Sequence, residues 1–400
     1  MPPMTAAFRS NMPRGIWALG LCSLFMDVSS ELVHSLLPVL LTTVLGSSML
    51  TVGLIEGVAE ATAAITKVFS GSVSDWLGRR KWLAVSGYAL AALTKPAFPL
   101  ADSAATVFAA RFADRIGKGI RGAPRDALVA DLVPPAQRGA AYGLRQTLDS
   151  VGAFLGPLLA ILALAVLADD VRAAMWVAVP FGFIAVAVLA VGVREPASTA
   201  PRERRPSLLR GWRALPKAYW QVVTIGAVFT LARFSEAFLI LRAQDIGLAL
   251  HWLPGVLIVM NVVYAASSYP AGVLSDRLGS RALLLAGLAV LIGADGLLAA
   301  AHAPWAVLAG AALWGLHMGL TQGLLARRVA DTAPDTLRGT AFGVFNLIGG
   351  IALFLASALA GGLWAGWGAP ATFACSAGLA ALAMLGVLGG ATSGRPDAPR

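Results

Sequence analysis

Long, largely apolar stretches dominate the chain and follow one another with short polar segments between them. Twelve are about 20 residues or longer, which is enough for a helix to cross the hydrocarbon core of a bilayer. They lie at residues 16–45, 50–70, 82–101, 104–130, 139–168, 171–193, 221–243, 252–273, 282–301, 304–326, 339–364 and 369–390. We therefore predict an all-α polytopic membrane protein with twelve transmembrane helices.

The composition of the chain points to the same class. Of its 400 residues, 58% are hydrophobic and 13% are charged, whereas a soluble domain is about a quarter charged. The two cysteines, Cys22 and Cys375, lie in apolar stretches far apart in the sequence. We therefore predict neither a disulfide framework nor a thiolate metal site.

The net charge of +10 has a specific distribution along the chain. With both termini in the cytoplasm, twenty of the 31 Lys and Arg residues fall in cytoplasmic segments and nine within spans. The other two, Arg172 and Arg242, lie at the outer ends of the spans 171–193 and 221–243 and are counted with the outside loops. This asymmetry is the one that the positive-inside rule describes. The basic charge is therefore a topology signal, and we expect no nucleic-acid partner.

Two segments of the first half recur about 200 residues later. GSVSDWLGRR at 71–80 returns as GVLSDRLGSR at 272–281, and VADLVPPAQRGAAYGL at 129–144 returns as VADTAPDTLRGTAFGV at 329–344. A unit of six helices is thus duplicated. We predict an N-terminal six-helix bundle at 1–193, a cytoplasmic linker rich in Pro and Arg at 194–220, and a C-terminal six-helix bundle at 221–400.

The repeated loop carries a family signature, and so does the fifth span. Gly71, Asp75, Gly78, Arg79 and Arg80 match the pattern G-x-x-x-D-x-x-G-R-[RK] between the second and third helices of the major facilitator superfamily, which this chain resembles over essentially its whole length. The second copy of the loop keeps Asp276. The resemblance implies two pseudo-symmetric bundles around a cavity at mid-membrane, a secondary transporter that works by alternating access, and a bacterial cytoplasmic-membrane location.

The fifth-span motif consists of four residues, Gly143, Gly152, Gly156 and Pro157. In the family this pattern resembles that of proton-coupled exporters, although Ala160 and Ile161 stand where two further glycines are expected. A second interpretation is structural, because glycines four residues apart allow two helices to approach closely. The stretch DRIGKGIRGAPRDALVAD also resembles a bacterial subgroup that includes metal or siderophore exporters.

The loop motif has a mechanical interpretation as a gate. Gly78 permits a tight turn between spans. Asp75 can accept hydrogen bonds from a helix end and pair with nearby arginines, so it could hold the cytoplasmic ends together in one state and release them in the other. Arg79 and Arg80 could instead serve only as topology anchors.

Charged residues inside the spans are costly, about 2.5–3.5 kcal/mol each at a helix centre. The fourth span nevertheless carries charges along one face, an arc of roughly 120°. We expect Arg111 and Arg115 to line the cavity, with one of them paired to a carboxylate of the first span. Ion pairs that only fix helix packing are the alternative. The candidates for proton coupling or substrate contact are Asp27, Glu31, His34, Glu56, Glu60, Arg111, Asp114, Arg115, Arg145, Asp149, Arg233, Glu236, Asn261 and His317.

The first span places three ionisable groups on one helix face. Asp27, Glu31 and His34 are spaced by four and three residues and fall within about 60° of arc. A desolvated carboxylate can load and release a proton near neutral pH, which favours proton coupling at Glu31 or Asp27. The same three side chains could bind a divalent metal, since imidazole and carboxylate are both metal ligands.

The sequence contains no H-E-x-x-H motif, no nucleophile motif and no phosphate-binding loop, so we expect neither an enzyme nor an ATP-driven pump. We expect no cofactor. The leading hypothesis is a monomeric, proton-coupled exporter of a small organic solute. The alternative is an exporter of a transition metal, such as nickel or iron, or of a metal chelate such as a siderophore.

Overall fold

The computed structural model describes residues 12–77, 79–195, 211–334 and 337–389. Within these ranges the chain forms helices and no strands, which confirms the predicted all-α class. The α-helices are α1 (Arg14–Val39), α2 (Met49–Leu77), α3 (Arg80–Thr94), α4 (Ala97–Leu100), α5 (Ala104–Asp131), α6 (Arg138–Val166), α7 (Val171–Trp176), α8 (Ala178–Gly192), α9 (Lys217–Leu231), α10 (Ala237–Asp245), α11 (Gly255–Leu278), α12 (Ser280–Ala299), α13 (Pro304–Thr332) and α14 (Arg338–Gly389). Four short turns of 3₁₀ or π type complete them: η2 (Leu40–Val44), η3 (Pro135–Gln137), η4 (Trp212–Ala214) and η5 (Leu250–Trp252).

Several predicted spans are not single straight helices. The third, sixth and seventh spans are each divided, the seventh between α9 and α10, where residues 232–236 leave the helical conformation. The last two spans form α14, which Gly368 interrupts with a φ of 82°. Glycine accepts this left-handed conformation without steric cost, so the chain can reverse there.

Among the described residues, seven stretches of helix are long and apolar enough to cross a membrane by length and composition alone. The α5 helix is not among them, because charged residues follow one of its faces. The α9 and α10 helices are short, with 15 and 9 residues. Charges and breaks inside spans therefore explain part of the shortfall from twelve, and the last two predicted spans count as one stretch, Thr340–Gly389.

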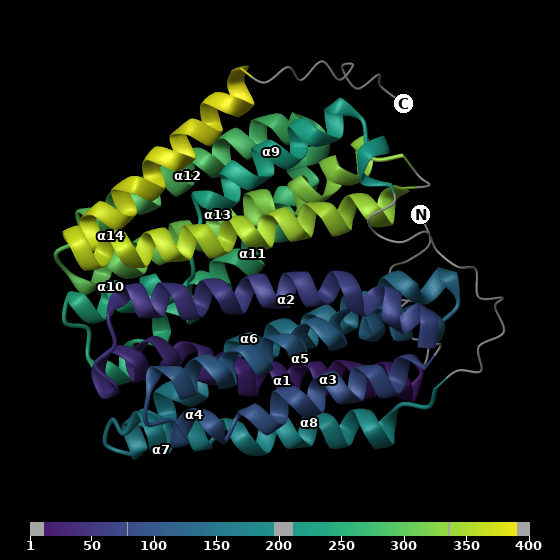
Figure 1. Cartoon of the computed structure of the whole chain (residues 1–400), viewed down its shortest axis with the longest axis horizontal. Helices are drawn as coiled ribbons and strands as arrows, with labels where there is room; N and C mark the ends of the chain where they lie inside the picture. Colours follow the sequence, from purple (N-terminus) through teal and green to yellow (C-terminus); the bar gives the residue numbers. More distant parts are fainter. Residues whose placement is uncertain (1–11, 78, 196–210, 335–336, 390–400) are drawn as a thin grey trace.

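The helices form two groups that lie side by side. In Figure 1, helices α1 to α8 (purple to teal) fill the lower half, and α9 to α14 (green to yellow) fill the upper half. Helix α2 packs against α14, and α6 packs against α11. The proposed linker at 194–220 stays a prediction, because residues 196–210 lie outside the described part of the chain; helix α9 already begins at Lys217.

The two halves meet closely along α2 and α14. A Cβ atom added at Gly57 of α2 would lie 2.9 Å from the carbonyl oxygen of Phe354, and one added at Gly53 would overlap the carbonyl oxygen of Ser357. At the end of the bundle where α1 finishes, Gln244 Nε2 donates to Thr43 Oγ1 at 2.8 Å, and His251 lies 3.4 Å from Asp169. These contacts join the halves at the left of Figure 1, the end away from the start of α1.

The glycines of the fifth-span motif differ in what surrounds them. A Cβ at Gly152 would lie 2.6 Å from Leu24 O, and one at Gly156 would lie 2.8 Å from Val28 O. Both positions therefore let α6 press against α1, Gly152 beside Asp27 and Gly156 beside Glu31. A Cβ atom added at Gly143 would meet no atom within 4 Å, so close helix packing does not explain why this position is a glycine. Pro157 lies inside α6, directly after Gly156.

Candidate functional site

A cavity of about 270 Å³ lies between the two halves, and we call it the central cavity. Both halves contribute charged groups to its wall, and the second half adds two aromatic rings. Its lining residues are Glu31, His34, Glu60, Arg115, Lys118, Ala153, Arg233, Phe234, Ser235, Glu236, Asn261, Trp314, Met318 and Leu353. Three carboxylates and three cationic side chains therefore face the same space.

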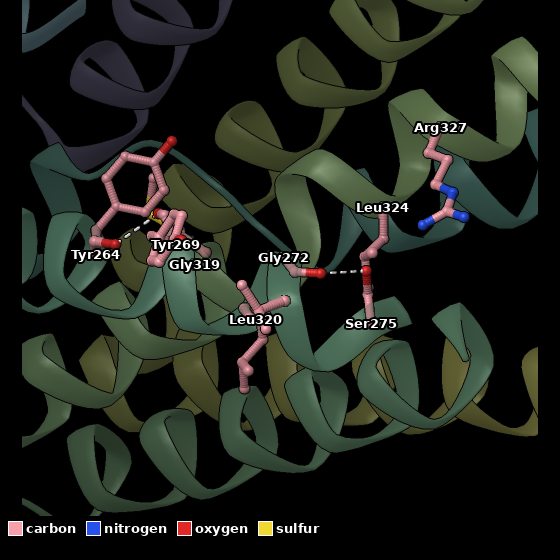
Figure 2. Close-up of a pocket in the computed structure, with 12 residues that line it drawn as sticks. Tyr264, Tyr269, Gly272, Ser275, Gly319, Leu320, Leu324 and Arg327 are labelled. Atoms are coloured by element: carbon pink, nitrogen blue, oxygen red, sulfur yellow. Dashed lines mark hydrogen bonds between the residues drawn. The ribbon is translucent and has the colours of Figure 1, made fainter. Parts of the chain in front are cut away.

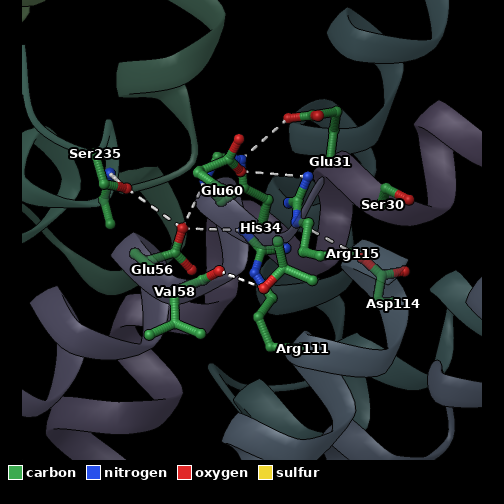
Figure 3. A network of polar contacts seen from close by, with 12 residues as sticks. Ser30, Glu31, His34, Glu56, Val58, Glu60, Arg111, Asp114, Arg115 and Ser235 are labelled. Atoms are coloured by element: carbon green, nitrogen blue, oxygen red, sulfur yellow. Dashed lines mark hydrogen bonds and ion pairs between the residues drawn. The ribbon is translucent and has the colours of Figure 1, made fainter. Parts of the chain in front are cut away.

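Glu56 of α2 is the centre of a polar network beside the cavity (Figure 3). Its Oε2 accepts a hydrogen bond from Arg111 at 3.0 Å and one from Ser235 Oγ at 3.3 Å, and it lies 3.7 Å from His34 Nε2. Glu56 and Arg111 are each only 1% exposed. Because Ser235 belongs to the second half, Glu56 connects the two halves directly.

A second set of ion pairs involves Asp114 and Arg115 of α5. Arg115 lies 3.3 Å from Glu60 of α2 and 3.9 Å from Asp114, while Lys95 lies 2.8 Å from Asp114. Lys95 also donates to Ser30 of α1 at 3.1 Å. The network therefore links α1, α2, α5 and the C-terminal end of α3 through ion pairs and through charge-assisted hydrogen bonds from Lys95, which are the stronger kind of hydrogen bond.

The expected pairing of Arg111 or Arg115 with the first span is wrong. Both arginines pair with α2, through Glu56 and Glu60. Arg115 lines the central cavity as expected, whereas Arg111 is buried behind its wall. The helical pattern of α5 predicted the charged face, but it could not predict which neighbour faces it.

The three ionisable residues of α1 have different surroundings. Glu31 Oε2 lies 3.4 Å from His34 Nδ1, and both residues line the cavity. Asp27 lies one turn further back, and the charged residues that act on it include Asp149, Arg121 and Arg125. Among the described residues, no three His, Cys, Asp or Glu side chains come together as a metal site would require. The metal-ligand interpretation of Asp27, Glu31 and His34 is therefore not supported.

A further charged cluster lies on α5 and α6 near Asp27. Arg145 pairs with Asp149 one turn along α6, and Asp126 lies 3.9 Å from Arg145. Arg125 donates to Ser23 of α1 at 3.2 Å. Arg145 and Asp149 thus contribute to helix packing here and are not part of the cavity wall.

The candidate residues from the second half also fall into two groups, those that line the cavity and those buried in the core. Arg233, Glu236 and Asn261 line the cavity. His317 is fully buried, its Nδ1 lies 2.8 Å from the carbonyl oxygen of Gly287, and its ring stacks on Phe229. His317 is therefore a core residue of the second half.

The gating motif is described only in part. Gly78 lies outside the described residues, and so do the side chains of Asp75 and Asp276, so the gating interpretation stays a prediction. Gly71 leaves room for a Cβ, at 3.6 Å from Ala123. Arg79 is exposed, and Arg80 pairs with Asp131 at the end of α5. This pair joins the loop motif to the repeated VAD segment, a contact that the sequence did not reveal.

Several residues at or beside the central cavity were not among the candidates from the sequence. Lys118, Phe234 and Ser235 line the cavity, and Lys95 holds Asp114, yet none of them was a candidate. Lys118 could have been identified because it lies on the charged face of α5. Ser235 could have been identified because it directly precedes Glu236. Asp295, a single carboxylate within the stretch 282–301, was missed altogether.

A larger cavity of about 600 Å³ lies along α11 and α13 (Figure 2). Its wall includes Tyr264, Tyr269 and Leu320, and Tyr269 is 81% exposed. Only the second half contributes to it. Because it lacks the charged groups of α1, α2 and α5, we do not assign the site to it.

Two groups of helices around a central polar cavity are the architecture of a large class of membrane transporters. The chain matches the family model of the Major Facilitator Superfamily over residues 19–260 and 234–399, so it belongs to the major facilitator superfamily. The resemblance found in the sequence is thereby confirmed, and the chain is a multi-pass membrane protein.

The relatives and structures agree with this family. An uncharacterized MFS-type transporter of Methanocaldococcus jannaschii is 31% identical over 88% of this chain and 89% of its own length. The multidrug resistance protein MdtH of Aeromonas hydrophila is 30% identical over 36% of each chain. The crystal structure of the nucleoside transporter NupG has a TM-score of 0.77 at 12% identity and covers 94% of this chain and 98% of its own, which shows the shared fold.

Proposed function

We propose that this protein exports a small organic solute in exchange for protons, by alternating access of the central cavity. The observation that carries the proposal is the cavity itself, where carboxylates, cations and aromatic rings from both halves face one space. We further propose that it acts as a monomer in the cytoplasmic membrane of a bacterium, with both termini in the cytoplasm. The positive-inside distribution of Lys and Arg supports this orientation.

The cavity wall favours a small substrate that carries both charge and apolar surface. At about 270 Å³ the cavity lies just below the range of drug-sized pockets, roughly 300–1,000 Å³. Phe234 and Trp314 can stack on an apolar or aromatic group, while Glu60, Arg115 and Arg233 can bind charged groups. This combination favours an amphiphilic organic solute over a hydrated metal ion.

Glu31 is the side chain best placed to carry the exchanged proton. It is 23% exposed, so water in the cavity can reach it, and it lies against His34. His34 in turn lies between Glu31 and Glu56, and Glu56 contacts Ser235 of the second half. Protonation of Glu31 would remove the charge that attracts His34 and would alter the contact between the halves.

The export direction is supported by two resemblances. The fifth-span motif resembles that of proton-coupled exporters, and its glycines bring α6 against α1, Gly152 beside Asp27 and Gly156 beside Glu31. A part of the chain is also similar to the multidrug resistance protein MdtH. Both observations favour efflux over uptake.

Binding measurements on the purified protein can test the substrate class. We would screen organic cations, organic anions, zwitterions, nucleosides, Ni²⁺, Fe²⁺ and ferric siderophores by thermal shift, and then measure affinity for each ligand that stabilises the protein. We expect stabilisation by an organic solute, and loss of its binding in Arg115→Gln but not in the control Asp102→Asn, an exposed position outside the cavity. Binding of a metal ion or a siderophore alone would contradict the proposal.

A further inference from the structure

Asp295 of α12 is a buried carboxylate that the cavity does not use. It is 0% exposed, and within the described residues no Lys, Arg or His forms an ion pair with it. Its two partners are neutral: Trp314 Nε1 donates to Oδ1 at 3.1 Å, and Ser376 Oγ lies 2.5 Å from Oδ2. An ionised carboxylate in such a place would be buried without a compensating charge, which is costly.

The hydrogen bonds of Ser376 indicate whether the carboxyl group of Asp295 is protonated. Its Oγ lies 2.6 Å from the carbonyl oxygen of Ala232 and 2.5 Å from Asp295 Oδ2. A hydroxyl has one hydrogen to donate, and a carbonyl oxygen can only accept. Both contacts become hydrogen bonds if Ser376 donates to Ala232 and a protonated Asp295 donates to Ser376. With ionised Asp295, one of the two acceptors would lose its donor.

Asp295 is connected to the cavity wall on two sides. Trp314, which donates to its carboxyl group, lines the cavity. Ala232, which Ser376 holds, is the residue that ends α9, and the next four residues, 233–236, form the non-helical part of the cavity wall. A change in the protonation state of Asp295 can therefore affect the positions of Arg233 and Glu236 through the hydroxyl group of Ser376.

The titratable groups on the neighbouring elements form no hydrogen bond or ion pair with Asp295 in the described part of the chain. On α10, Arg242 donates to the carbonyl oxygens of Leu298, Ala299 and Ala301 at the end of α12, and it pairs with Asp245. The other groups around α12 are His317 of α13, which contacts Gly287, the thiol of Cys375 on α14, Tyr264 of α11, and Arg233 and Glu236 at the cavity. Asp295 thus has only Ser376 and Trp314 as recorded polar partners in the described structure.

We propose that Asp295 is a second proton-binding site, which couples protonation to the shape of the central cavity. When Asp295 releases its proton to water, the Ser376 hydroxyl turns from Ala232 to the carboxylate. The freed Ala232 carbonyl then lets residues 233–236 move. The coupling part of this inference rests on the proposed proton exchange, whereas the protonation of Asp295 does not.

Infrared spectroscopy tests the protonation directly, without any substrate. The wild-type protein should show the carbonyl stretch of a buried carboxylic acid at neutral pH, and Asp295→Asn should remove it. The control Asp102→Asn should leave it unchanged. Asparagine retains a donor for Ser376 and an acceptor for Trp314, so the variant should fold. A band that is absent from the wild type, or unchanged in Asp295→Asn, would overturn the assignment.

Substrate binding then tests the coupling. In the wild type, substrate affinity should change with pH, on the order of tenfold between the two protonation states, and both Asp295→Asn and Ser376→Ala should reduce that dependence. An unchanged pH dependence in both variants would overturn the coupling role. If the wild type exchanges no protons at all, the proposed function fails, but the infrared band still decides whether Asp295 is protonated.

Discussion

At the scale of single residues, the most deeply buried charges of the first half are held in pairs. Arg111 and Glu56 are almost completely buried and 3.0 Å apart. Glu56 Oε1 and Arg111 Nε have no partner of their own within the described structure. Each charge therefore depends strongly on the other, because a buried charge without a partner is much less stable than a buried pair.

We expect Arg111→Ala to destabilise the protein by about 3–5 kcal/mol, because it removes the nearest counter-charge of the buried Glu56, whose other ion-pair neighbour, His34, lies further away at 3.7 Å. The double variant Arg111→Leu with Glu56→Leu should recover most of that loss, since it buries no charge. Thermal unfolding of the detergent-solubilised protein would measure both effects, with size-exclusion chromatography after heating to quantify the protein that remains folded. If the double variant were less stable than Arg111→Ala, the pair would have another structural role.

The sequence predicted the kinds of residue at the site better than their contacts. The charged face of α5 followed from helical periodicity, and Arg115, Glu31 and Glu236 do line the cavity. The partner of Arg111 did not follow, since the fold alone decides which of several carboxylates lies opposite. Asp295 gave almost no signal, because its partners are a serine and a tryptophan that look like ordinary residues of apolar spans.

At the scale of secondary-structure elements, close contact between α1 and α6 positions Glu31. Gly156 has no space for a side chain, because Val28 O and Glu31 Cβ would each lie 2.8 Å from an added Cβ. On the same helix, a Cβ atom added at Gly143 would have no neighbouring atom within 4 Å. The helix boundaries themselves were predicted well for long uninterrupted spans, whereas the break between α9 and α10 had no clear sequence marker.

The two glycines offer a matched pair of variants. We expect Gly156→Leu to destabilise the protein by about 1–3 kcal/mol through overpacking, and to weaken transport by displacing Glu31. Gly143→Leu should change stability far less. Both variants can be compared by unfolding temperature and by substrate affinity, and equal effects would show that α1 and α6 do not require this close approach.

At the scale of the whole molecule, polar contacts hold the two halves together at the end where α1 finishes. Thr43 and Gln244 form one such contact, and Asp169 and His251 form another. Under the positive-inside topology this is the outer end, so the described conformation has its outer side joined. Alternating access requires these contacts to separate in the other state.

A reversible cross-link can test that separation. We expect a disulfide between Thr43→Cys and Gln244→Cys to form under oxidising conditions and to stop transport, because it prevents the outer ends from parting. A reducing agent should restore transport, and each single variant should transport normally under both conditions. Full transport by the cross-linked protein would mean that the outer ends need not separate.

In the proposed mechanism, solute leaves through the central cavity in exchange for protons that Glu31 carries. The most direct measurement is proton movement in proteoliposomes, with an imposed gradient of the transported solute and no initial pH difference. Wild-type protein should move protons against the solute flow, and Glu31→Gln should abolish this movement while solute exchange at equal concentrations continues. Solute flow without proton movement in the wild type, or normal proton movement in Glu31→Gln, would contradict the account.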